Sequence, residues 1–345
     1  MNVRSVREIV RPRKLVISHF DFPAAAKIAR AFRTRRMTMK AVLLTGHGGP
    51  EKLQYADAAD PTPGPGEVLV DVVASVNAAD YKVRRGGGRY ALKQFPHILG
   101  RDFSGVVAAL GPGVSDLAVG DAVLGVTEQG VEGAYAEKIA IKAALVAKKP
   151  ERLTHAQAAA LALTGLTALT ALEDTAHLRA GETILIQGGA GGVAGFAVQL
   201  AKYLGASAIT TASASNHDYV RSLGADRVID YNKEDFRRIG PICDVVFDTV
   251  GGGVRAGCYA VLKPGGRLVW IAPAPDGFQP SRSDVQTLRP NVVRDRAHLE
   301  RILALVAQGA VKPPVLALFP LAEAARAHEI SEARHLQGKL VLMVE

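Results

Sequence analysis

The sequence predicts an α/β protein in which a doubly wound parallel sheet is joined to a smaller, mostly β domain. Three observations support this. From about Ala180 onward, short apolar segments alternate with helical ones, the pattern of a parallel sheet covered by helices. Before that point, strand-like segments are separated by glycine and proline turns, which is typical of a β domain. The length of 345 residues is enough for two domains.

The α/β half begins with a strand, a glycine-rich turn and a helix in direct succession. The strand is the apolar run Thr183–Ile186, and the turn Gly189–Ala194 fits the pattern G-x-G-x-x-G/A. Apolar residues then recur at helical spacing from Val193 to Leu204, and Gly205 ends the helix. The glycines let the backbone approach a pyrophosphate, and the helix N-terminus attracts its charge. This context favours dinucleotide binding over a merely structural tight turn.

The other elements follow from apolar runs and turns. Beyond Thr183–Ile186, we predict strands of a Rossmann sheet at Ala208–Thr211, Arg227–Ile229, Val245–Phe247 and Arg267–Ile271. In the β domain, we predict strands at Lys40–Leu44, Glu67–Val76, Val106–Leu110 and Ala122–Val126. A helix rich in small residues is expected over Ala156–Leu172, a last helix near Arg296–Ala307, and a final strand over Lys339–Val344.

These elements suggest four segments. Residues 1–38 form a basic extension, and residues 39–155 form the first part of the β domain. Residues 156–290 form the Rossmann domain, and residues 291–345 are expected to return to the β domain.

The net charge of +9 is concentrated at the N-terminus. Residues 1–38 hold ten Lys and Arg against two Asp and Glu, whereas the rest of the chain holds 32 against 31. The folded body is therefore unlike a nucleic-acid-binding protein. The basic segment is a targeting presequence, a basic arm for nucleic acid or membrane, or an extension upstream of a natural start at Met37 or Met39. The last reading is favoured.

The composition, 48% hydrophobic and 22% charged, is ordinary for a globular enzyme. No uninterrupted apolar run approaches the ~18 residues of a membrane span. Cys243 and Cys258 are far apart in sequence and show no metal-ligand spacing. We therefore expect a reduced, cytoplasmic protein without a membrane span, with organellar targeting by residues 1–38 left open.

Several motifs in order resemble the medium-chain dehydrogenase/reductase family, in its zinc-free quinone oxidoreductase (zeta-crystallin-like) branch. The similarity runs from Met39 to Glu345. It rests on Gly64–Val70, Val76–Arg84, Leu99–Val107, Gly188–Ala194, Leu223–Asp226, Asp244–Gly252 and Gly338–Val341. The resemblance implies a GroES-like β domain, an active site in the cleft beside the Rossmann domain, and a homodimer formed through Rossmann sheet edges.

Two departures from the zinc alcohol dehydrogenases bear on the chemistry. The resemblance places Asn77 where those enzymes have a zinc cysteine, and Arg101-Asp102 where they have a His-Glu pair. A guanidinium stays protonated and has no lone pair for a metal. The four-cysteine lobe for structural zinc is also missing, so no metal is expected. The remaining reaction is reduction of an activated acceptor, a quinone or an α,β-unsaturated carbonyl compound.

The choice of cofactor depends on the end of the second Rossmann strand. Enzymes that use NAD usually have an Asp or Glu about 20 residues after the turn. Residues 210–217 have no carboxylate, so the sequence favours NADPH. Relatives often carry Lys or Arg where this chain has Ser215, and Arg221 is a possible substitute on a helix face. The expected contacts to the ribose and its phosphate are Ser213, Ser215, Asn216 and Tyr231.

The other expected cofactor contacts follow from the turn and from the resemblance. They are Thr164, Gly188, Gly189, Ala190, Gly191, Gly192, Val193, Ala194, Val250, Gly251, Ile271, Ala272 and Pro273. The last five follow the fourth and fifth strands, and ligands bind outside the carboxyl ends of such strands.

The candidates for polar assistance in catalysis are Asn77, Asp80 and Lys82, with Tyr81 further away. Asp80 has an alternative role as a structural partner of Arg84 or Arg85. The sequence offers no nucleophile and no acid–base pair.

The leading hypothesis is therefore an NADPH-dependent reductase that transfers hydride to a small quinone or enone without a metal. One alternative is an alkenal or enoyl-thioester reductase of the same fold. The other is an NADPH-binding protein with a structural or RNA-binding role, for which the basic segment would be the distinguishing feature.

Overall fold

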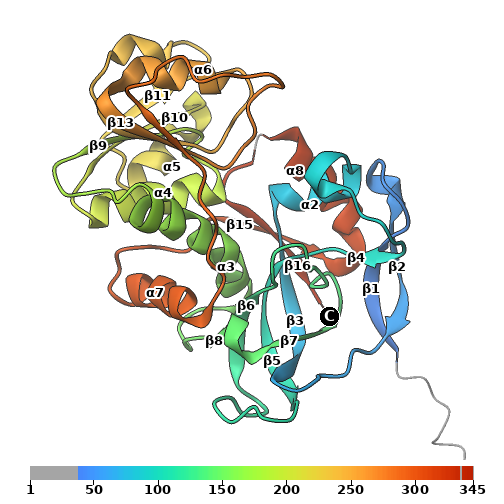
Figure 1. The fold of residues 1–345 in the computed structure, drawn as a ribbon. Coiled ribbons are helices and arrows are strands. Elements are labelled where there is room, and N and C mark those ends of the chain that lie inside the picture. The colour runs from blue at the N-terminus through green and yellow to red at the C-terminus, as the bar shows by residue number, and fades with distance from the viewer. Residues whose placement is uncertain (1–37, 335, 345) are drawn as a thin grey trace, which may run out of the picture. The chain divides into compact units, whose positions relative to one another are not determined.

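The computed structural model describes residues 38–334 and 336–344 (Figure 1). The predicted basic extension lies, apart from Thr38, outside the described residues. The chain from Thr38 onward forms one compact unit built on three sheets.

A six-stranded sheet, all parallel, confirms the predicted Rossmann half. Its order is β11-β10-β9-β12-β13-β14. The chain therefore moves outward from β9 in one direction and then returns to start again beside it at β12. The carboxyl ends of β9 and β12 therefore form the switch point, the place at which doubly wound sheets bind ligands.

The six strands of this sheet are β9 (Thr183–Ile186), β10 (Ser207–Ala212), β11 (Arg227–Asp230), β12 (Cys243–Asp248), β13 (Leu262–Trp270) and β14 (Gln286–Leu288). All of them except β14 were predicted within a few residues of their observed bounds. The sequence analysis missed β14, because three residues that are mostly exposed give no apolar run.

Helices cover this sheet and join it to the rest of the chain. They are α3 (His155–Leu169), α4 (Gly192–Tyr203), α5 (His217–Ser222), α6 (Val254–Cys258) and α7 (Arg296–Ala307). Helix α3 is buried on nearly every side, which explains why small residues fill it and no polar face appears.

Helix α3 continues into a wider π turn, Thr170–Thr175. Together they form, among the described residues, the one helical stretch that is long and apolar enough to cross a membrane by length and composition. However, 89% of its apolar window is buried inside the protein, as expected for a core helix. A count of uninterrupted apolar residues overlooked it because threonines divide the run.

The remaining strands form the β lobe, the part with antiparallel sheets in Figure 1. Its larger sheet has the order β15-β16-β3-β5-β6-β8, with β7 also paired to β3, and its smaller sheet has the order β2-β1-β4. Strand β16 follows the Rossmann half in sequence yet pairs with β3. The C-terminal strands thus complete a sheet that the N-terminal half began.

The strands of the β lobe are β1 (Thr38–Leu44), β2 (Leu53–Ala59), β3 (Glu67–Val76), β4 (His97–Ile98), β5 (Asp102–Leu110), β6 (Ala122–Val126), β7 (Lys138–Lys142), β8 (Val146–Lys148), β15 (Leu316–Pro320) and β16 (Lys339–Met343). Its helices are α2 (Ala78–Arg85) and α8 (Ala324–Ala333). The sequence analysis predicted no helix over α2, whose eight residues are largely polar.

The two halves meet where the glycine turn lies beside the start of β16. Gly338 N–H donates to the carbonyl of Ala190 at 2.9 Å, and Gly191 and Gly338 form an isolated parallel bridge. Gly338 has φ +73°, and a Cβ there would lie 2.0 Å from the Val315 carbonyl oxygen. Only glycine fits this position.

Candidate active site at the carboxyl edge of the parallel sheet

The glycine turn after β9 is shaped by its neighbours. Gly188 has φ +76°, a conformation that favours glycine. A Cβ on Gly189 would lie 2.2 Å from the Thr210 hydroxyl oxygen. On Gly192 it would lie 2.6 Å from Cδ of Lys339. Because these positions are glycine, the side chains of Thr210 in β10 and Lys339 in β16 can lie directly against the backbone of the turn and the start of α4.

The N-terminus of α4 offers an anion-binding surface. No side chain caps it, because its N-cap residue is Gly191. The first N–H groups of a helix have no partner within the helix, and they carry partial positive charge. A pyrophosphate therefore fits this end of α4.

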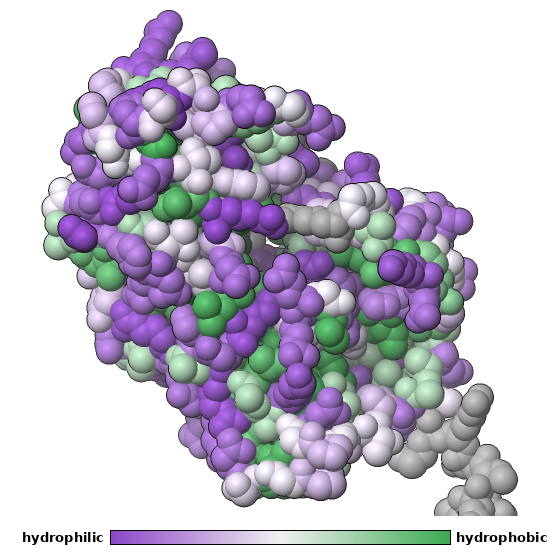
Figure 2. Space-filling view, viewed as in Figure 1, coloured by the Kyte–Doolittle hydropathy of each residue, from purple (hydrophilic) through white to green (hydrophobic). Residues whose placement is uncertain are grey.

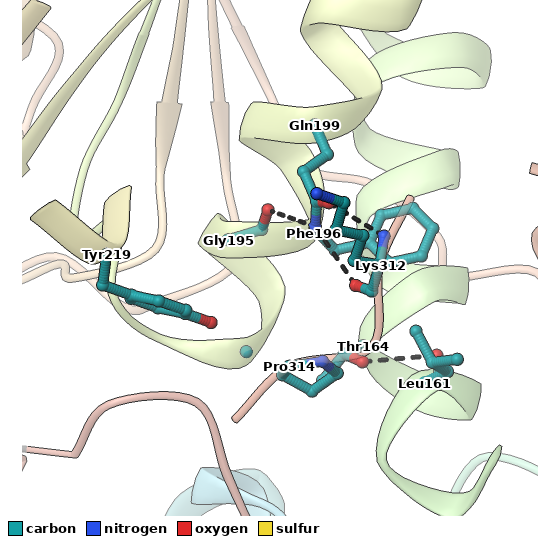
Figure 3. Close-up of a pocket in the computed structure, with 9 residues that line it drawn as sticks. Leu161, Thr164, Gly195, Phe196, Gln199, Tyr219, Lys312 and Pro314 are labelled. Carbon is teal, nitrogen blue, oxygen red and sulfur yellow. Dashed lines mark hydrogen bonds between the residues drawn. The ribbon is translucent and has the colours of Figure 1, made fainter. Parts of the chain in front are cut away.

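One side of α4 is closed by packing. Figure 3 shows Leu161 and Thr164 of α3 facing the first turns of α4, with Tyr219 and Pro314 beside them. The space among these residues is only about 10 Å³, room for one water at most. Thr164, expected at the nicotinamide, donates its hydroxyl to the Ala160 carbonyl at 2.6 Å and is 3% exposed. Its methyl group, not its hydroxyl, lies against Gly192.

The residues expected to select the cofactor gather after β10 and β11. The hydroxyls of Ser213 and Ser215 lie 3.1 Å apart, and Asn216 Nδ2 donates to Ser213 Oγ at 3.1 Å. Tyr231 follows β11 and is 50% exposed. Arg221 is exposed and pairs with Asp218, so it lies on a solvated helix face.

The loops after β12 and β13 hold each other in place. Asp248 accepts hydrogen bonds from the N–H groups of Val250 and Gly251, at 3.0 and 2.8 Å. Gly252 N–H donates to the Pro273 carbonyl at 2.8 Å. Buried Arg255 also pairs with Asp248 and donates to the Ala272 carbonyl. The predicted contacts Val250–Gly251 and Ile271–Pro273 therefore share one edge with the glycine turn.

Across the junction from α4, three polar side chains form a buried chain. Lys339 Nζ donates to Asn77 Oδ1 at 2.6 Å and to the Val76 carbonyl at 2.7 Å. Asn77 Nδ2 donates to Asp102, whose other oxygen accepts from the Leu163 N–H at 3.3 Å. Burial lowers the pKa of Lys339, and the nearby carboxylates of Asp102 and Asp80 oppose this. The side-chain amide of Asn77 is therefore fixed in orientation by a cation on one side and a carboxylate on the other.

Asp80 lies directly behind Asn77. Its carboxylate accepts from the Asn77 N–H at 2.8 Å and from the Tyr135 hydroxyl at 2.9 Å. Its other oxygen lies 3.8 Å from Arg101 Nε. Burial raises the pKa of Asp80 to about 7, and Arg101 opposes the rise. Asp80 thus holds the start of α2 and does not reach the surface.

The alternative partners considered for Asp80 were wrong. Arg84, fully buried, donates to Glu332 at 2.5 Å, and Arg85 pairs with the same carboxylate. Lys82, the third catalytic candidate, is half-buried on α2.

Sequence reasoning missed Lys339, Tyr135 and Glu132 as members of this site. Lys339 stood inside the motif Gly338–Val341 but received no role. Glu132 binds Arg101 Nη2 at 2.8 Å, and Tyr135 contacts Asp80 from 55 residues away. No local pattern signals contacts between residues so far apart in sequence.

The residues at the positions of the zinc ligands do not suit a metal. Asn77 is engaged by an ammonium, and Arg101 is a cation paired with Glu132. In the part of the chain that the structure describes, no three His, Cys, Asp or Glu side chains form a group that could hold a metal ion. The chemistry of this site is therefore considered without a metal.

The raised pKa of Asp80 predicts a pH-dependent stability. The native state holds the proton up to about pH 7, whereas the unfolded state releases it near pH 3.8. The free energy of unfolding therefore falls, relative to that of Asp80→Asn, as the pH rises from about 4 to 7, by at most about 4 kcal/mol. Above pH 7 the difference levels off. Urea unfolding across this pH range measures it.

The matched control is Asp57→Asn, at an exposed carboxylate paired with Lys40. The native protein compared with Asp57→Asn should show no such fall, because both keep Asp80. A constant difference between the native protein and Asp80→Asn would mean that Asp80 is ionised throughout this range.

Comparison with known proteins agrees with this architecture. Residues 64–151 match the alcohol dehydrogenase GroES-like domain, and residues 223–342 match the zinc-binding dehydrogenase family. The chain is 36% identical over 321 residues to the chloroplastic NADPH-dependent alkenal/one oxidoreductase of Arabidopsis thaliana, covering 88% of this chain and 79% of that one.

Two further proteins extend the similarity. The quinone oxidoreductase of Pseudomonas aeruginosa is 34% identical, over 88% of this chain and 99% of its own. The solved quinone oxidoreductase of Coxiella burnetii superposes with a TM-score of 0.82 at 34% identity, over 90% of this chain and all of that one. This chain is an oxidoreductase of the medium-chain dehydrogenase/reductase family and belongs to its quinone oxidoreductase branch.

Proposed function

We propose that the protein uses NADPH to reduce a small quinone or α,β-unsaturated carbonyl compound. The observation that carries this proposal is the position of Lys339. Its stem packs on Gly192 at the N-terminus of α4, and its ammonium binds Asn77 Oδ1. A cofactor with its phosphates at α4 would extend toward the amide of Asn77. The similar alkenal/one and quinone oxidoreductases support the same acceptors.

The cofactor supplies a hydride, and the chain supplies binding, orientation and hydrogen bonds. Phosphates would meet the N–H groups of α4, while the hydroxyls of Ser213 and Ser215 would meet the ribose and its 2′-phosphate. The loops Val250–Gly251 and Ile271–Pro273 would bound the nicotinamide.

Asn77 is the group best placed to assist the reaction. Among the described residues Nδ2 has one acceptor, Asp102, so its second hydrogen is available to the carbonyl oxygen of the substrate. The ammonium on Oδ1 draws electron density from the amide and so strengthens it as a donor. As hydride arrives, negative charge develops on that oxygen, and Asn77 stabilises it. The proton then comes from water.

Two other features support the proposed homodimer and the proposed cytoplasmic location. Strand β14, at the edge of the parallel sheet, has a partner on one side, so a second copy could extend the sheet there into the expected homodimer. Cys243 and Cys258 are free, buried thiols, as expected in the reducing cytoplasm.

The first test is oxidation of NADPH and NADH by the purified protein with 1,4-benzoquinone, 9,10-phenanthrenequinone and a short 2-alkenal. We expect turnover with NADPH, and the preferred acceptor distinguishes a quinone reductase from an alkenal reductase. Tight NADPH binding without turnover of any acceptor would contradict the proposal. Nucleic-acid binding that weakens steeply with salt would then favour the non-catalytic alternative.

The cofactor preference predicts the effect of Ser215→Asp. A carboxylate beside Ser213 would repel the 2′-phosphate, so kcat/KM for NADPH should fall about tenfold or more, while that for NADH is kept. The control is Ser207→Asp, at the start of β10, the strand whose other end leads to Ser215. Equal losses with both cofactors would mean that the 2′-phosphate does not bind there.

The position of Lys339 predicts the effect of Lys339→Met. Met has a similar length, but it leaves the Asn77 amide oxygen and the Val76 carbonyl without the ammonium donor, so the melting temperature should also fall and is measured beside the kinetics. The substitution removes a positive charge near the phosphates and frees the amide of Asn77 to rotate. We expect KM for NADPH to rise and kcat to fall about tenfold, the effect of about 1.4 kcal/mol. The exposed Lys142→Met is the control, and unchanged kinetics for Lys339→Met would refute the assigned role.

A further inference from the structure

The segment that leaves the carboxyl edge of β14 brings a second arginine to the active site. Its residue Arg294 donates from Nη1 to the Thr127 carbonyl at 2.7 Å. Thr127 directly follows β6, and its own N–H donates to the Arg101 carbonyl at 2.8 Å. In the adjacent strand β5, Asp102 pairs with Val126. Arg294 therefore lies one strand away from the carboxylate that holds Asn77.

The three cations near Asn77 differ in whether they have a hydrogen-bonded partner for their charge. Arg101 is satisfied by Glu132, through two hydrogen bonds of 3.0 and 2.8 Å. Lys339 is satisfied by Asn77 and a backbone carbonyl. Arg294, in contrast, has no carboxylate within 4 Å among residues 38–334 and 336–344, and its Nε is buried without a hydrogen-bond partner.

An unpaired guanidinium in a half-buried position is costly, because it has lost water and gained no counter-ion. Burial and the nearby Arg101 both lower the pKa of Arg294, while Asp102, Glu132 and Asp80 oppose this from a distance. The guanidinium would recover its lost interactions if a ligand brought an anion to it. Because Nη1 already binds the Thr127 carbonyl and Nε is enclosed, the contact to a carboxylate or sulfonate oxygen would come from Nη2.

We propose that Arg294 binds an anionic group of the acceptor, so that the enzyme prefers quinones and enones that carry such a group. This inference rests on the proposed function and narrows its substrate class. The reacting carbonyl binds at Asn77, and the anion binds at Arg294, on the side of the site formed by the end of β6. The hydride passes from NADPH to the electrophilic carbon, the acceptor gains a proton from water, and the anionic group is unchanged.

The test compares acceptors with and without an anionic group. Because this group also changes the reactivity of the acceptor, the preference is measured as the ratio of kcat/KM values in the native enzyme divided by the same ratio in Arg294→Met. Two matched pairs serve: 3-penten-2-one against trans-4-oxo-2-pentenoate, and 1,2-naphthoquinone against its 4-sulfonate. The first pair tests a carboxylate and the second a sulfonate. We expect this preference for the anionic member to be about tenfold, as for one charge-assisted hydrogen bond. Arg294→Met should spare the neutral acceptors, whereas Arg294→Lys should keep part of the preference.

The matched control is Arg289→Met, in the same segment, whose guanidinium stacks on Trp270 at 5.3 Å. It should leave the preference intact. Equal ratios in the native enzyme and in Arg294→Met would overturn the inference and leave the proposed function standing. This includes an equal loss on neutral and anionic acceptors in Arg294→Met, since that is the mark of a structural role.

A binding measurement separates this inference from the reductase activity. Levulinate has a carboxylate but no activated double bond, and 2-pentanone is its neutral counterpart. With NADP⁺ present, levulinate should raise the melting temperature of the native protein and not that of Arg294→Met, and 2-pentanone should raise neither. If no acceptor is reduced but levulinate still binds in this way, the anion site stands and the reductase proposal fails. No effect of levulinate on the native protein would overturn the anion site.

Discussion

The active site depends on one backbone contact, the hydrogen bond from Gly338 to the carbonyl of Ala190. It joins the phosphate-binding turn of the parallel sheet to the strand that completes the antiparallel sheet. Lys339 follows in the chain, and its side chain is thereby carried across the junction to Asn77. A Cβ at Gly338 would overlap the backbone of Val315, and one at Gly192 would displace the side chain of Lys339. Close approach of the backbones is therefore a condition for the polar site.

The polar groups of the site form one connected set in place of isolated catalytic residues. Lys339, Asn77 and Asp102 are bonded in series, and Asp80 supports them through the backbone of Asn77. Such a set keeps a donor in a fixed direction at a buried position, where it can stabilise developing charge more strongly than in bulk water. In the proposed reaction the same ammonium would lie near the cofactor phosphates and orient the amide, so that binding and chemistry would be coupled through a single side chain.

The sequence predicted well what is local and poorly what is distant. The glycine turn and five parallel strands were visible because each is a short pattern of apolar residues and turns. The bond between Asn77 and Lys339 joins residues 262 positions apart, and no spacing rule finds it. Helix α2 was missed because it is short and polar, and β14 because it has three residues. Arg294 gave no signal, since its significance lies in having no counter-ion in the part of the chain that the structure describes.

Helix α3 has a consequence for how the protein evolves and folds. Its side chains share one apolar cluster with Leu124 and Val126 of β6 and with Ile184 and Ile186 of β9. Cutting the chain at either end of the Rossmann half would strip apolar cover from the other half. The two halves have different folds but share this apolar cluster, so we expect them to unfold together. Recombination between relatives is then expected to succeed when α3 and both of its faces are inherited together.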